Sequence, residues 1–174
     1  MLKKAVIIGP ESTGKSTLAK NLADYFGCLW VPEFAREFLE KLDRPYRYDD
    51  LLDIAKGQIS FENELSQKSK ELLVCDTDLN VIKVWSEHRF GKVDPWIIKM
   101  IAKRKYDLYL LTDIDIPWQD DPQREHPQPE MREHFFEIYR SLLLDSGVPF
   151  CVISGKDDFR KSKSIDFIKK TLFE

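Results

Sequence analysis

Residues 9–17 have types and a spacing suited to holding phosphate groups. Their sequence, Gly-Pro-Glu-Ser-Thr-Gly-Lys-Ser-Thr, matches the pattern GxxxxGK[ST] at every fixed position. Gly9 and Gly14 permit the unusual backbone angles that bring amide N–H groups close to phosphate oxygens. We expect Lys15 to reach the β- and γ-phosphates of ATP and the Ser16 hydroxyl to ligate Mg²⁺. The other loop residues predicted to bind ATP are Glu11, Ser12, Thr13 and Thr17.

A second candidate for phosphate chemistry is Asp76, which follows the apolar run 72–75. Enzymes with this kind of loop place a carboxylate at such a strand end to hold Mg²⁺ or its water. Asp76 and Asp78 also precede a helical pattern, so helix capping is the alternative interpretation. Capping alone would explain Asp78, which we otherwise predict to contact the substrate.

Glu33 and Arg36 follow another apolar run, 28–31, and lie three residues apart, which places them on one helical face. Glu33 is suited to accept a proton from a substrate hydroxyl, while Arg36 would steady a phosphate or hydroxyl. The alternative interpretation is an ordinary ion pair on a solvated helix.

A charged segment stiffened by four prolines, residues 113–129, suits a lid over the phosphates. Arg124 is expected to stabilise charge on the γ-phosphate in the transition state, with Arg132 as a second candidate. The alternative is a solvated loop in which Arg124 pairs with Glu125 or Asp121.

The candidates for contacts with the base of ATP and with a flat heterocyclic group of the substrate are weaker. Trp85 and Trp118 offer flat aromatic faces and Gln58 offers an amide, but ordinary packing also explains each of them. Gly155 follows the last expected strand, where its backbone could line an adenine.

These residues need a scaffold, and the apolar pattern predicts one. Short apolar runs alternate with longer amphipathic segments, which is typical of an α/β fold with a mainly parallel sheet. Because the phosphate motif lies between a strand and an amphipathic helix, its context disfavours a chance match. The predicted fold class is a three-layer α/β/α sandwich with five strands and with ligands at the strands' carboxyl ends. Strands are expected at 5–8, 28–31, 73–75, 108–112 and 149–153, and helices at 15–26, 33–42, 50–72, 78–90, 95–103, 129–145 and 158–172.

Composition is consistent with a single globular domain over residues 1–174. Hydrophobic residues make up 43% of the chain and charged residues 33%, and the net charge is -3 with both signs interleaved. This pattern argues against a nucleic-acid partner, which requires a concentrated basic face. No apolar run reaches the roughly 20 residues needed to span a bilayer. Three cysteines without metal or redox spacing, and no secretory signal, favour a soluble cytoplasmic protein. No feature specifies an oligomeric state.

Several segments together resemble the kinase domain of NadR-type proteins, in the family's order and over nearly the whole chain. They are residues 9–17, Val-Pro-Glu-Phe-Ala-Arg at 31–36, Asp-Thr-Asp at 76–78, residues 106–118 with Asp-Ile-Pro-Trp, and Arg-Glu-His-Pro at 124–127. The resemblance implies a P-loop fold with strand order 2-3-1-4-5. It also implies ATP-dependent phosphorylation of the ribose 5′-hydroxyl of nicotinamide riboside to nicotinamide mononucleotide, a step of NAD salvage.

Carried onto this sequence, the resemblance assigns Lys15 and Ser16 to ATP and Mg²⁺, and Asp76 to the metal side or to the base. It places Glu33 and Arg36 near the ribose and its 5′-hydroxyl.

The resemblance further implies that Arg124 closes the lid and that an aromatic side chain such as Trp85 stacks on the nicotinamide. Long NadR proteins also contain a nucleotidyltransferase domain, but this sequence has no HxGH-type motif, so adenylyl transfer is not inferred.

Two other functions are compatible with the sequence. One is a kinase for a different nucleoside or nucleotide, such as a thymidylate-kinase-like enzyme, which would need basic groups around Arg36, Arg44 and Arg47 for the acceptor's phosphate. The other is a regulatory ATPase that hydrolyses ATP without an acceptor.

Overall fold

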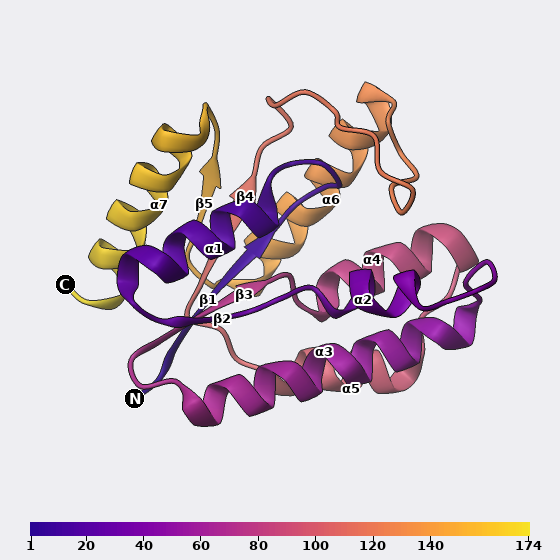
Figure 1. The fold of residues 1–174 in the computed structure, drawn as a ribbon, viewed down its shortest axis with the longest axis horizontal. Coiled ribbons are helices and arrows are strands. Elements are labelled where there is room, and N and C mark those ends of the chain that lie inside the picture. Colours follow the sequence, from indigo (N-terminus) through magenta and orange to yellow (C-terminus); the bar gives the residue numbers. More distant parts are fainter.

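The computed structural model describes residues 1–174 and consists of one parallel sheet flanked by helices (Figure 1). The sheet has five strands in the order β2-β3-β1-β4-β5, so the predicted fold class and strand order are confirmed. No helix is long and apolar enough to cross a membrane. The elements are β1 (Lys3–Ile8), α1 (Lys15–Phe26), β2 (Leu29–Val31), α2 (Phe34–Glu40), α3 (Tyr48–Lys68), β3 (Leu72–Asp76), α4 (Leu79–Phe90), α5 (Pro95–Lys103), β4 (Leu108–Thr112), α6 (Pro129–Ser146), β5 (Phe150–Ile153) and α7 (Asp157–Leu172).

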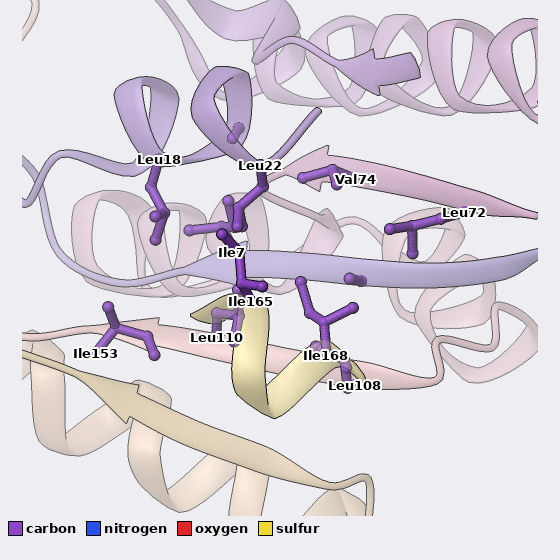
Figure 2. Close-up of a cluster of buried hydrophobic side chains, with 12 residues drawn as sticks. Ile7, Leu18, Leu22, Leu72, Val74, Leu108, Leu110, Ile153, Ile165 and Ile168 are labelled. Atoms are coloured by element: carbon purple, nitrogen blue, oxygen red, sulfur yellow. The ribbon is translucent and has the colours of Figure 1, made fainter. Parts of the chain in front are cut away.

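Alternate strand residues face the two helical layers because successive side chains of a strand point to opposite sides. One face packs against α1 and α7, as the close-up of this cluster shows (Figure 2). The opposite face packs against α4 and α6, with α3 beside them. In β1, Ala5 and Ile7 belong to the first cluster, and Val6 and Ile8 belong to the second. Burial on both faces explains the continuous apolar run of this central strand.

The expected helices differ from the structure in several boundaries and in the exposure of one side chain. Helix α3 ends at Lys68 rather than at residue 72, because Leu72 is already the first residue of β3. The spacing of Leu18, Leu22 and Tyr25 predicts one shared face of α1, but Leu18 and Leu22 are buried whereas Tyr25 is 47% exposed. Small side chains take its place: Ala19 and Ala23 are buried and allow α1 to approach the sheet closely.

The register of the sheet brings the strand ends of the predicted site together. Ile7 of β1 is paired with Asp76 of β3, and Ile8 is paired with Leu111 of β4. The chain segments that leave β1, β3 and β4 therefore start at one edge of the sheet. In Figure 1 both chain ends lie on the other side of the molecule from the turn between β1 and α1.

Candidate active site

The loop between β1 and α1 has the backbone geometry of an anion-binding turn. Gly9, Ser12 and Gly14 all have positive φ angles, of 153°, 56° and 76°. A left-handed serine is uncommon and marks a constrained turn. Because α1 begins directly after Gly14, the N–H groups at the positive end of this helix face the loop. The structure thus provides the phosphate-binding geometry that the motif predicts.

Gly9 lies so close to Thr112 that no side chain fits there. An added Cβ would stand 2.3 Å from Thr112 Oγ1 and 2.9 Å from its carbonyl oxygen. Gly9→Ala is therefore expected to displace the loop, to destabilise the fold by about 1–3 kcal/mol and to weaken ATP binding. The measurement is Tm together with titration of a non-hydrolysable ATP analogue.

Gly27→Ala is the matched control for this change. Gly27 also has a left-handed φ, but nothing lies within 4 Å of an added Cβ. It should lower Tm through backbone strain alone and leave nucleotide affinity unchanged. If Gly9→Ala bound nucleotide as well as the control, the close packing of the loop would be irrelevant to binding.

Thr13 fixes the loop internally rather than by offering its side chain to a ligand. Its hydroxyl donates to the carbonyl of Pro10 at 2.7 Å and shares a 2.7 Å hydrogen bond with the Thr112 hydroxyl. Its carbonyl accepts from Arg160 of α7 at 2.8 Å. Only the backbone N–H of Thr13 therefore fits its predicted role in ATP binding.

Ser16 and Asp76 lie in direct contact below this loop and are suited to a hard cation. The Ser16 hydroxyl donates to Asp76 Oδ2 at 2.5 Å, while Asp76 Oδ1 is buried without a hydrogen-bond partner. Mg²⁺ prefers oxygen ligands and commonly uses one or two protein groups plus phosphate oxygens. No cluster of three or more His, Cys, Asp or Glu side chains is arranged to hold a metal. The residues therefore fit a Mg²⁺ ion that is bound jointly with nucleotide.

Burial is the main cause of the raised pKa of Asp76. Its side chain is 1% exposed, and burial, reinforced by the negative charge of Glu33, raises the pKa of Asp76 to about 6. The Ser16 hydrogen bond and the positive charge of Lys15 oppose this rise. A carboxylate held in this way gains a strong favourable interaction when a cation arrives.

The Asp78 carboxylate is bound within the protein. Between the two carboxylates, Thr77 has a φ of 75°, and the chain turns sharply there. Asp78 caps α4 by accepting from the Asn80 N–H at 2.9 Å, and it accepts from the Tyr109 hydroxyl at 2.8 Å. Both oxygens are thus used within the protein, and Asp78 does not line the cavity. The substrate-binding role predicted for Asp78 does not fit, whereas the capping alternative does.

A cavity of about 330 Å³ extends from the phosphate loop to the start of α2. Glu33 and Arg36 line it together with Lys15, so the structure brings together the residues predicted for the two substrates. Gln58 is absent from its walls. The Gln58 side chain instead accepts from the Phe34 N–H at 2.8 Å and donates to the Pro32 carbonyl at 3.2 Å. Its predicted base contact is therefore replaced by a structural one that holds the turn carrying Glu33.

The segment between β4 and α6 lies across this cavity and is attached on both sides. On the phosphate side, Glu11 accepts the N–H groups of Glu125 and His126 at 3.0 and 3.1 Å. On the acceptor side, Arg36 pairs with Asp121 at 3.0 Å. Figure 1 shows this segment beside the turn between β1 and α1. The segment therefore lies over the cavity, and its action as a lid stays a prediction.

The aromatic candidates occupy different places. Trp85 lines the cavity and donates its indole N–H to the Tyr46 hydroxyl at 3.0 Å. The Tyr46 hydroxyl in turn donates to Glu125 at 2.9 Å. Trp118 lies outside the cavity wall, so its predicted substrate contact does not fit. Gly155 is likewise outside this wall, and its N–H donates to Asp115 at 2.5 Å, so it has no free donor for an adenine.

Several wall residues were not found from the sequence. Tyr139 of α6 is buried, lines the cavity and lies near Glu33, whose charge adds to the effect of burial in raising the pKa of Tyr139. On α4, one helical face supplies wall side chains, and their i, i+3 and i+4 spacing was the available signal. These further wall residues of α4 are Val81, Val84 and His88. Phe135 of α6 also lines the cavity.

A family model described as an AAA domain matches residues 4–160. The chain belongs to this AAA domain family. The AAA domain chain is also 24% identical over 178 aligned residues to the "Trifunctional NAD biosynthesis/regulator protein NadR" of Salmonella typhimurium. That alignment covers 99% of this chain but 43% of the relative, so the chain spans less than half of the relative's length. The resemblance to NadR-type proteins inferred from the motifs is confirmed.

Several proteins of known structure share the fold of this chain. NadR in complex with NR has a TM-score of 0.82 at 24% identity and covers 98% of this chain and 50% of its own. NadR in complex with NAD and AMP-PNP has a TM-score of 0.79 at 24% identity, with coverage of 98% and 49%. Thymidylate kinase from Ehrlichia chaffeensis reaches 0.63 at 13% identity, with coverage of 95% and 98%. At these identities the likeness establishes the fold, a P-loop fold shared with kinases.

Proposed function

We propose that this protein is a nicotinamide riboside kinase that transfers the γ-phosphoryl group of ATP to the ribose 5′-hydroxyl. The observation that carries this proposal is that the phosphate loop, Glu33 and side chains of residues 113–129 line one and the same cavity. Similarity to NadR over the whole chain, including a NadR structure with NR, supports the choice of acceptor. The lid over residues 113–129 and the site roles below are parts of the same proposal.

The loop amides and Lys15 bind the triphosphate and hold it in position. Ser16 and Asp76 would hold Mg²⁺, which supplies charge neutralisation of the phosphates when bound. The new bond forms between the 5′-oxygen and the γ-phosphorus, and the bond between that phosphorus and the bridging oxygen of ADP breaks. The hydroxyl proton passes to Glu33, and Arg124 stabilises the charge that develops on the transferred group.

Glu33 is preferred to Asp76 as the proton acceptor because of their positions. Glu33 lines the cavity, whereas Asp76 is buried behind Ser16 and outside its walls. Glu33→Gln is expected to lower kcat by about 10²–10⁴-fold while ATP affinity stays unchanged. Stopped-flow or steady-state rates, with calorimetry for ATP, measure both quantities.

Glu37→Gln is the matched control, since Glu37 lies on α2, the helix that Glu33 precedes, but is exposed and paired with Lys41 at 2.5 Å. It should leave both quantities unchanged. If Glu33→Gln weakened ATP binding and left kcat intact, the acceptor-side role would be wrong.

A nucleotide acceptor, as in thymidylate kinase, is disfavoured by the positions of the basic residues. Arg44 is bound bidentately to Asp50, at 2.7 and 2.9 Å, and neither Arg44 nor Arg47 lines the cavity. Arg36 is already paired with Asp121. The cavity therefore offers no free basic group at its acceptor end for an existing phosphate.

The deciding experiment measures ADP formation with Mg²⁺, ATP and a panel of nucleosides and nucleotides. We expect strong stimulation by nicotinamide riboside and release of nicotinamide mononucleotide. Turnover of thymidylate alone would replace the substrate assignment, and ATP loss independent of every acceptor would favour a regulatory ATPase.

A further inference from the structure

Two arginines from different segments meet at one residue of the phosphate loop. Arg124, in the segment between β4 and α6, donates to the Ser12 hydroxyl at 3.2 Å. Arg132, in the first turns of α6, donates to the Ser12 carbonyl at 3.2 Å. Both side chains line the cavity. Two positive charges are thus placed side by side at the phosphate loop.

Neither guanidinium is paired with a carboxylate, because Arg124 donates to the Gln119 carbonyl and the Ser12 hydroxyl, and Arg132 donates to two backbone carbonyls. Arg132 is only 8% exposed, its other partner is the Ile116 carbonyl at 3.2 Å, and its Nε is buried without a partner. Burial, followed by the charge of Arg124, lowers the pKa of Arg132. The other buried arginine, Arg160, is 3% exposed and is paired with Asp115. Burying a cation without a counter-ion is unfavourable. The two arginines are therefore suited to bind an anionic ligand, which would supply the missing negative charge.

Trp118 supplies the surface against which the two like charges are held. The guanidinium carbon of Arg124 lies 6.0 Å from the centre of the indole ring, and that of Arg132 lies 5.9 Å from it. The attraction between a cation and an aromatic face partly offsets the repulsion between the arginines. The Trp118 N–H donates to Asp120 at 2.9 Å, which fixes the orientation of the ring.

We propose that Arg132 is a second catalytic arginine, which binds the terminal phosphate of the triphosphate together with Arg124, and that Trp118 is the positioning residue for both. The proposal rests on the proposed phosphoryl transfer but not on which nucleoside is the acceptor. It gives Trp118, which has no place in the cavity wall, a role in the reaction.

The test compares binding of Mg·AMP-PNP, which carries a third phosphate group, with binding of Mg·ADP, which does not. Arg132→Gln is expected to weaken AMP-PNP binding by about 10–100-fold and ADP binding by less than about 3-fold. Arg140→Gln, an exposed position on the same helix, is the control and should change neither. The Tm of each ligand-free variant is measured alongside, and Arg132→Lys, which keeps the charge, should show a smaller loss.

A structural role would give a different pattern. If Arg132 merely joined the Ser12 and Ile116 carbonyls, Arg132→Gln would weaken both nucleotides equally, and that result would overturn the proposal. Trp118→Phe is expected to retain the preference for AMP-PNP, whereas Trp118→Leu should reduce it and lower kcat without raising KM for the acceptor. Equal behaviour of Trp118→Phe and Trp118→Leu would remove the positioning role.

Failure of this inference is distinguishable from failure of the proposed function. Wild-type protein that did not bind Mg·AMP-PNP at all would refute the kinase assignment and the arginine pair together. If wild-type protein bound Mg·AMP-PNP and Arg132→Gln protein bound it equally well, the arginine pair alone would be refuted.

Discussion

Lys15→Ala is expected to lower kcat/KM by about 10²–10⁴-fold, a loss of activity as large as that expected for Glu33→Gln. The Lys15 ammonium group lines the cavity and donates to the Pro10 carbonyl at 2.8 Å, so it is held at the phosphate loop. Its charge would contact the β- and γ-phosphates most strongly as the γ-phosphoryl group is transferred. Steady-state kinetics with varied ATP measures the effect.

Lys20→Ala is the control for this loss, because Lys20 lies on the same helix but has an exposed side chain. It should have wild-type kinetics. An unchanged rate in Lys15→Ala would remove this lysine from the active site.

Asp76→Asn is expected to have opposite effects on activity and stability. Activity should fall by about 10²–10³-fold, because the carboxylate that would hold Mg²⁺ is lost. The ligand-free protein should become more stable at pH 8 by up to about 3 kcal/mol, because a buried charge is removed. Asparagine can still accept the hydrogen bond from Ser16.

The pH dependence follows from the direction of the pKa shift. Folding raises the pKa of Asp76 from 3.8 to about 6, so the folded protein binds more protons than the unfolded chain between these values. The contribution of Asp76 to stability is therefore fully present below about pH 4 and is lost as the pH rises through about 6. Urea unfolding in EDTA, at several pH values from 4 to 8, measures it.

The difference in unfolding free energy between wild-type and Asp76→Asn protein should grow over this pH range and then remain constant. Asp24→Asn, at an exposed position of α1, is the matched control and should follow the wild-type curve. A constant difference between wild-type and Asp76→Asn protein at every pH would show that Asp76 is ionised with no cost in the fold.

The same residue illustrates how far the sequence predicts the site. An apolar run ending in Asp76 predicted a carboxylate at a strand end, and the phosphate motif predicted where the ligand would bind. Both patterns are local, because strand burial and the turn of a phosphate loop depend on neighbouring residues. For the same reason the boundaries of α1, α5 and β4 are those predicted.

The partners of the longer polar and aromatic side chains depend on the tertiary structure. Gln58 and Asp78 have the polar groups of ligand-binding residues, but the fold places the Phe34 N–H beside one and the Tyr109 hydroxyl beside the other. Trp118 and Arg132 are adjacent although they are separated in the chain.

Short-range patterns in the chain thus specify the strands, the phosphate loop and the acidic strand ends, because each of these depends on neighbouring residues. The tertiary structure alone determined which polar side chains remain available to a ligand, because that depends on partners that the fold brings from distant segments.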